Sequence, residues 1–238
     1  MSDQQLLQLV TSAAPASIAE VIDLMEKIDA NLASGDGLKW FNFLYLAVTK
    51  EIRDHPPAGG WDRENWLTRL DVVFAGFYFS AIQAFLEGDS SLASSWAALF
   101  EARHQSGIDR IQFALAGMNA HINHDLSLAL IRTNQEFGIH PSLTSPEHDD
   151  FERVNSLLEA VTPQVLQTLA VGIVGEVVQD AGKIGRLLAF WSVSAARDLA
   201  WDFGDHLTRL DEISRSFAIS AQDQVTGALG RSLLAAFR

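Results

Sequence analysis

Residues 108–138 read IDRIQFALAGMNAHINHDLSLALIRTNQEFG, and this stretch decides the fold class. Apolar residues recur in it at spacings of three and four, which is the period of an α-helix. Gly138 follows the last periodic residue and is a typical helix stop. Because Phe113, Leu128 and Ile131 flank the main apolar stripe, little of this helix is left for water. The stretch therefore predicts a long central helix that is buried.

The rest of the chain has the same periodicity, and alternating runs bounded by hairpin turns are missing. We therefore predict an all-α protein, a single-domain bundle of about seven to nine helices over residues 1–238, with residues 1–16 loosely ordered. Besides the central helix, the pattern predicts helices over about 17–33, 38–54, 61–88, 92–103, 145–162, 163–180, 183–210 and 211–237, with a break at Gly182 and Gly185.

Two helix starts have specific signals. Ser17 and Glu20 have the spacing of a capping box, in which each side chain bonds the other residue's backbone N–H. Ser145 precedes Pro146 and the acidic residues of a first turn, which favours a helix that begins there.

The composition limits the classes of function. The formal net charge is -13 and the 17 Lys and Arg residues are dispersed, so we expect no nucleic-acid partner. The chain has no cysteine, so any metal ion would need His, Asp or Glu ligands. No signal peptide and no uncharged run long enough to span a bilayer is apparent, and we expect a cytoplasmic protein without a membrane span.

The central helix carries an unusual polar cluster at Asn119, His121, Asn123, His124 and Asp125. His121 and Asp125 are four residues apart, so they share one face beside the core stripe, whereas His124 points to the opposite side. Polar groups buried in such a helix need partners.

Three interpretations of the cluster remain open. His121 and Asp125 are candidate ligands of a divalent metal such as zinc, which predicts a metal-dependent hydrolase-like enzyme. They are equally candidate catalytic residues of an acid-base pair. In the third interpretation the cluster is a structural network, and the chain is a non-catalytic module that binds a protein or an apolar small molecule. The oligomeric state does not follow from these residues.

The run Gly-Met-Asn-Ala-His-Ile-Asn-His-Asp-Leu at 117–126 is part of a wider likeness. With Leu70-Asp71-Val72-Val73-Phe74 before it and Phe151-Glu152-Arg153-Val154-Asn155 after it, the chain resembles the bacterial family filed as domain of unknown function 5995. The resemblance implies a shared fold and no catalytic roles. It marks further polar positions as pocket candidates, which together with the two asparagines of the cluster are Asp71, Asn119, Asn123, Asp150, Asn155 and Arg197.

Two weaker resemblances name concrete chemistries. Glu101 with His104, and Asp202 with His206, have the spacings of ligand pairs in haem-oxygenase-like di-iron oxidases. The His and Asp one turn apart are similar to those of helical zinc-dependent phospholipases C and nucleases, although the His-rich motifs and the N-terminal Trp ligand of that group are missing. His140 and His148 in the following loop and first turn are the additional ligand candidates.

Overall fold

The computed structural model describes residues 2–171 and 192–235, and in this part of the chain every regular element is a helix, as predicted. The elements are α1 (Asp3–Ser12), α2 (Ile18–Asn31), α3 (Gly37–Asp54), α4 (Glu64–Glu87), α5 (Ser94–Ala102), α6 (Arg110–Ala120), the π-helical turn η1 (His121–Asp125), α7 (Leu126–Phe137), α8 (Pro146–Val171), α10 (Val193–Thr208) and α11 (Glu212–Leu233). Taken as one continuous helix, α6, η1 and α7 form the predicted central helix.

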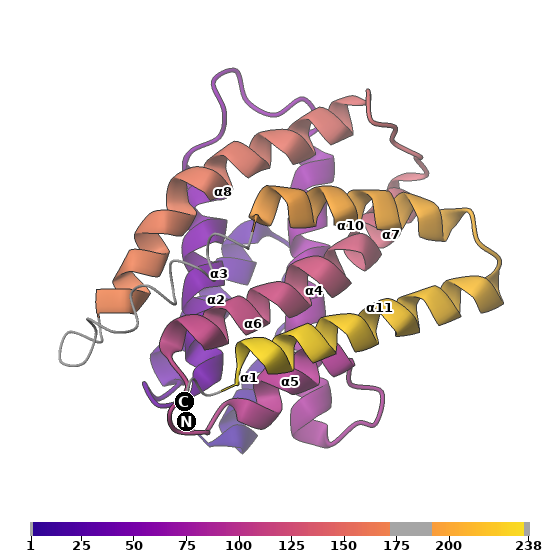
Figure 1. Ribbon diagram of the computed structural model, residues 1–238. Coiled ribbons are helices and arrows are strands. Elements are labelled where there is room, and N and C mark those ends of the chain that lie inside the picture. The colour runs from indigo at the N-terminus through magenta and orange to yellow at the C-terminus, as the bar shows by residue number, and fades with distance from the viewer. Residues whose placement is uncertain (1, 172–191, 236–238) are drawn as a thin grey trace.

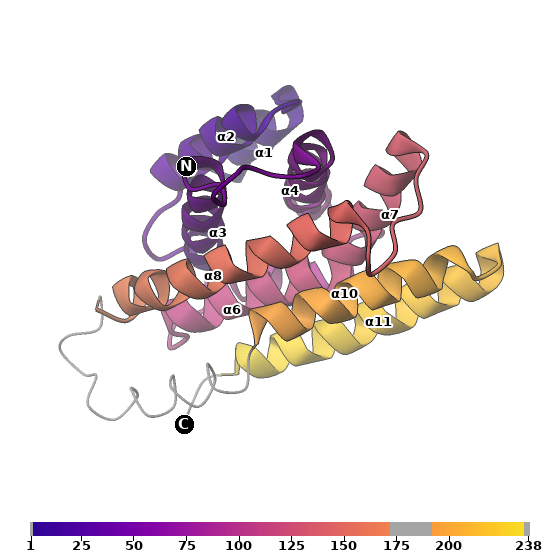
Figure 2. The same ribbon diagram turned by 90° about the horizontal axis from the view of Figure 1, so that it is seen from above.

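The helices form two crossing layers. The central helix runs beside α8, α10 and α11, while α3 and α4 cross it and appear nearly end on in Figure 2. α1 and α2 cover α3 and α4 on the side away from the central helix, and α5 packs against α6 and α11 (Figure 1). Because neighbours surround it on all sides, the central helix is the core of the described structure.

The central helix begins with a reciprocal cap between Asp109 and Gln112 and ends at Gly138, whose φ of 64° is left-handed. Between Ile111 and Leu130 every residue is buried except Asn123 and Leu128, which are half-buried. The sequence did not reveal the π turn, in which the N–H of Leu126 donates to the carbonyl of His121.

Both predicted helix starts are present. The Ser17 hydroxyl accepts a bond from the N–H of Glu20 at 3.3 Å, although the Glu20 carboxylate accepts from Ala16 and not from Ser17. The Ser145 hydroxyl accepts a bond from the N–H of His148, and α8 begins at Pro146.

Two predictions about element boundaries are wrong. Residues 1–16 are not loosely ordered throughout, because α1 forms there and buries Leu6 and Val10 against the core. The helix boundary predicted at Pro163 is absent, since α8 continues to Val171. Proline removes one backbone hydrogen bond, but burial of Val165 and Leu169 beyond it favours continuation. The break predicted at Gly182 and Gly185 lies outside the described residues, as does the first part of the helix predicted over 183–210.

α4 is the one helix among the described residues that is long and apolar enough to cross a membrane by length and composition. Of the most apolar 18-residue segment of α4, 50% is buried inside the protein. Trp66, Leu70 and Tyr78 of α4 belong to the core. Because a buried core helix meets the same criterion, this property is weak evidence for a membrane. The absence of a membrane span stays a prediction.

Gly117 lets α3 approach the central helix closely. A Cβ atom at this position would lie 2.3 Å from Cγ of Phe41 and 2.6 Å from its Cβ, so the whole Phe41 side chain would have to move. The contrasting position is Gly76 in α4, around which a Cβ atom would meet nothing within 4 Å. The close approach of α3 therefore depends on glycine at 117 and not at 76.

We predict that Gly117→Ala lowers the free energy of unfolding by about 1–3 kcal/mol, the usual cost of an overpacked core. Gly76→Ala is the matched control and should raise it by up to about 1 kcal/mol, because alanine is the better helix former. Urea unfolding followed by circular dichroism measures both changes. Equal effects of the two substitutions would contradict the close packing at Gly117.

Candidate functional site

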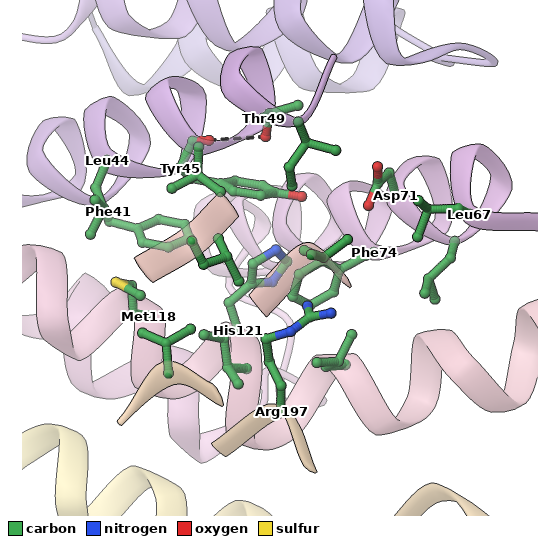
Figure 3. A pocket seen from close by; sticks show the side chains of 18 residues that line it. Phe41, Leu44, Tyr45, Thr49, Leu67, Asp71, Phe74, Met118, His121 and Arg197 are labelled. Atoms are coloured by element: carbon green, nitrogen blue, oxygen red, sulfur yellow. Dashed lines mark hydrogen bonds between the residues drawn. The ribbon is translucent and has the colours of Figure 1, made fainter. Parts of the chain in front are cut away.

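A pocket lies where α3, α4, the central helix, α8 and α10 meet, and Figure 3 shows the side chains around it. Its cavity volume is about 60 Å³. Most of its wall is aliphatic or aromatic, and its polar members are Tyr45, Thr49, Asp71, His121 and Arg197. An apolar cavity with a few convergent polar groups is typical of a small-molecule site.

His121 lies at the centre of this pocket wall and is oriented from one side. Its Nδ1 lies 2.9 Å from Oδ2 of Asp125, one turn along the helix, as the spacing predicted. The same Oδ2 accepts a hydrogen bond from Nε1 of Trp96, also at 2.9 Å. Trp96, Asp125 and His121 therefore form a chain of hydrogen bonds that fixes the imidazole ring. The ring also stacks on Phe74, with centroids 3.5 Å apart and planes 5° from parallel.

The other nitrogen of His121, Nε2, is buried and has no hydrogen-bond partner within the described residues. A buried polar atom without a partner costs about 1–3 kcal/mol, so such atoms are rare in proteins unless a ligand or water completes them. When Nδ1 carries the proton and donates it to Asp125, Nε2 has a lone pair available to whatever enters the pocket.

Burial sets the charge state of the pair. It lowers the pKa of His121 well below the ordinary value, so the imidazole is neutral at pH 7. Burial also raises the pKa of Asp125 well above its ordinary value, and the hydrogen bond from Trp96 acts in the opposite direction. A neutral histidine that is oriented by a carboxyl group can act as a general base through its free nitrogen.

Asp71 and Arg197 enter the same pocket from α4 and α10. Burial raises the pKa of Asp71 to about 7, against the opposing charge of Arg197. Burial lowers the pKa of Arg197 to about 10, so the guanidinium remains charged at neutral pH. Asp71 is half-buried, whereas Arg197 is only 7% exposed.

The other predicted pocket residues have different positions. Asn155 accepts a bond from Nε of Arg197 at 2.6 Å and so supports the pocket from behind. Asp150 accepts bonds from the N–H groups of Asp62 and Arg63, which fixes the start of α4. These two residues therefore hold structure around the pocket and do not line it.

The remaining members of the polar cluster face α11. Asn119 donates to the carbonyl of Thr226 at 2.9 Å, and Asn123 donates to Asn119. Nδ1 of His124 lies 3.0 Å from Oε1 of Gln222. The predicted division of the cluster, with His121 and Asp125 on one side and His124 on the other, is confirmed.

Some functional residues were not found from the sequence. Tyr45 and Thr49 lie in an apolar helix, α3, whose pattern gave no sign of a pocket. The bond from Trp96 to Asp125 depends on the packing of α5 against α6. These contacts join segments far apart in the chain, which periodicity alone does not reveal.

The ligand sets predicted for metals do not assemble in the part of the chain that is described. There, no three His, Asp or Glu side chains lie close enough together to hold one metal ion. Glu101, Asp202 and His206 are exposed on helix surfaces, and His104 is exposed in the turn after α5. His148 packs its ring against Trp201, with centroids 4.7 Å apart. The metal interpretation of His121 and Asp125 stays a prediction without a third described ligand.

The architecture and the pocket define an all-α protein with one buried His-Asp pair at an apolar cavity. Residues 18–236 match a family described as a family of unknown function (DUF5995), and the chain belongs to this family. The resemblance inferred from residues 117–126 is thereby confirmed. No curated protein and no solved structure matches the chain.

We predict that His121 and Asp125 contribute to stability as one unit. His121→Ala leaves Asp125 with Trp96 alone, so each single substitution should cost about 1–3 kcal/mol. The variant His121→Ala/Asp125→Asn should be little worse than the worse single one, with an interaction energy of about 1 kcal/mol or more. Urea unfolding of the four proteins measures this, and simple addition of the two losses would contradict it. His124→Ala is the control and should be milder.

The pKa of Asp71 predicts how stability depends on pH. The unfolded pKa of aspartate is about 3.9, while that of Asp71 in the folded protein is about 7. Between these values the folded state binds more protons, so ionisation of Asp71 costs stability as the pH rises, and the loss is complete above the folded pKa. As the pH rises from about 4 to about 8, the free energy of unfolding of Asp71→Asn should therefore increase relative to that of the parent.

The control for this pH series is Asp89→Asn. The N–H and hydroxyl of Ser91 lower the pKa of Asp89, so its contribution is present at high pH and is lost as the pH falls. Relative to the parent, Asp89→Asn should therefore stay constant between about pH 4 and about pH 8 and change only below about pH 4. Unfolding titrations across the pH range measure both variants, and a parallel course of the two would refute the assignment to Asp71.

Proposed function

We propose that this protein binds an apolar small molecule in the pocket and transfers a proton on it through His121. The observation that carries the proposal is the buried Nε2 of His121, which has no partner in the described part of the protein although Nδ1 is fully engaged. A bound molecule with a polar group at this point would satisfy Nε2, and apolar surface would surround the rest of it.

The reaction we assign first is hydrolysis of an ester. In this reaction Nε2 of His121 takes a proton from water while the water oxygen bonds to the carbonyl carbon. The carbon-oxygen bond to the leaving alcohol then breaks, and that oxygen takes the proton back from Nε2. Asp125 holds the imidazole through Nδ1, and in its ionised form it compensates the charge that Nε2 gains.

A pocket that only binds, without catalysis, is the second candidate. It is favoured by the near-complete burial of His121, which is 2% exposed, because a general base must also be reached by water. Both candidates use the same polar groups, so kinetic measurements must distinguish them. If the pocket is catalytic, substitution of His121 lowers the rate of hydrolysis; if it only binds, the substitution changes ligand affinity alone.

The test is hydrolysis of para-nitrophenyl octanoate, an apolar ester whose product absorbs visible light. The parent protein should hydrolyse it above the buffer rate, and His121→Ala should lower kcat/KM by about a hundredfold or more. His124→Ala is the matched control, because it removes the neighbouring buried histidine on the opposite side of the helix, and its activity should be retained. Circular dichroism checks that both variants are folded.

Three results would overturn the catalytic proposal. The first is no hydrolysis by the parent protein. The second is an equal loss in His121→Ala and His124→Ala, which would trace the activity to general stability and not to the pocket. The third is full activity in His121→Ala, which would remove His121 from the mechanism.

A further inference from the structure

The polar side of the pocket is assembled from three separate elements. Arg197 extends from α10, Asp71 from α4 and His121 from η1, and Figure 3 shows all three around one space. Of these, the guanidinium of Arg197 is the group that carries a full charge, so the chemistry of the ligand depends on how Arg197 is held.

Arg197 is fixed by protein contacts that leave part of it free. Its Nε donates to Oδ1 of Asn155 at 2.6 Å, and its Nη2 donates to the carbonyl of Phe151 at 2.8 Å. The guanidinium carbon lies 4.0 Å above the centroid of the Phe151 ring. Its Nη1 makes no hydrogen bond to any described residue. A guanidinium has five N–H donors in one plane. The bonds to Asn155 and Phe151 fix this plane and leave Nη1 available to a ligand.

Three acidic side chains act on Arg197, namely Asp71, Glu152 and Asp198, and of these only Asp71 lines the pocket. Arg197 is charged near neutral pH, whereas Asp71 has a pKa of about 7 and is only partly ionised. On the pocket side, a buried guanidinium with a free N–H group favours an anion beside it. Asp71 in its protonated form can also donate a hydrogen bond to an oxygen of that anion.

We propose that the pocket takes an aliphatic monocarboxylic acid, with its carboxylate between Nη1 of Arg197 and the carboxyl group of Asp71 and its chain along the apolar wall. The proposal rests on the part of the proposed function that says a small molecule binds in the pocket, and it does not require that the protein hydrolyses an ester. The same acid is the product of the ester reaction assigned to His121, so the carboxyl end of an acyl group would lie where His121 can reach it.

The polar groups select a monoanion with oxygen acceptors. A phosphate monoester carries up to two charges, and one guanidinium beside an ionising Asp71 compensates at most one of them. An alkylammonium would bring a second cation next to Arg197. A neutral alcohol would pack against the apolar wall but would make no charge-assisted hydrogen bond to Arg197.

The experiment compares four ligands with the same chain and different polar ends: octanoate, octanol, octylamine and octyl phosphate. Isothermal titration calorimetry of the full chain with each gives the affinities. Octanoate should bind about tenfold or more tightly than any of the others, because it alone gains a charge-assisted bond to Arg197 without excess charge. Binding of octanol as tightly as octanoate would overturn the assignment.

Variants identify the groups responsible. Arg197→Gln should remove the preference for octanoate over octanol, whereas Arg132→Gln, which removes an exposed cation outside the pocket, should keep it. Because Arg197 also joins α10 to α8, circular dichroism and thermal melting must show that Arg197→Gln is folded. If Arg197→Gln does not fold, Asp71→Asn tests the carboxylate site instead. This substitution removes no hydrogen bond to a described residue, so we expect the variant to fold.

Asp71→Asn is tested through the pH dependence of octanoate binding. The ionisable groups that face Asp71 in the pocket are Arg197, Tyr45 and His121, and none of them changes charge near pH 7, because burial raises the pKa of Tyr45 and lowers that of His121. The parent protein should bind octanoate about tenfold more weakly at about pH 8 than at about pH 6, as Asp71 ionises. Asp71→Asn should bind with equal affinity at both values, and a persistent tenfold change would refute the role of Asp71.

The outcomes separate this inference from the proposed function. Tight, selective binding of octanoate without ester hydrolysis would support the carboxylate site and refute catalysis by His121. Hydrolysis that depends on His121, combined with equal affinity for octanoate and octanol, would refute the carboxylate site alone. Binding of none of the four ligands would refute both.

Discussion

The structure depends on one chain of hydrogen bonds that joins α5 to the central helix. Trp96, Asp125 and His121 lie where neighbours cover the helix on all sides, so none of their polar groups can rely on bulk water. Each bond in the chain offsets the desolvation of a group that would otherwise favour exposure. The chain ends at Nε2 of His121, where the described protein offers no partner. The central helix, although buried, therefore presents one polar atom without a hydrogen-bond partner, Nε2 of His121, at the pocket.

Close helix packing gives this chain its exact geometry. Gly117, one turn before His121, admits Phe41, and the Phe41 ring lies in edge contact with the imidazole at a centroid distance of 5.7 Å. On the opposite face Gly230 lets α11 approach the amide of Asn119. Gly117 therefore positions the aromatic wall of the pocket, and Gly230 allows close packing of α11 on the opposite face. The packing of the central helix and the geometry of the site thus depend on the same helix.

Much of this follows from the sequence, and the missing parts have a common cause. Periodicity predicted the helices, and the four-residue spacing predicted the contact of His121 with Asp125, because both are local properties of one helix. The partner Trp96 and the pocket residues Tyr45 and Thr49 come from other helices, and which side chains meet there depends on crossing geometry. The predicted helix boundary at Pro163 is wrong for a related reason. The burial of Val165 and Leu169 in the tertiary structure outweighs the local preference of proline to end a helix.

The two carboxyl groups near His121 show how position divides their roles. Asp125 accepts a bond from Trp96 and is hydrogen-bonded to the ring of His121, so its charge state is tied to that of its partners. Asp71 has no hydrogen-bond partner among the described residues, and burial raises its pKa to about 7, so it ionises near neutral pH. One group therefore maintains geometry while the other responds to what enters. A pocket with a fixed base, a fixed cation and one adjustable carboxyl group can distinguish polar ends that share the same apolar chain.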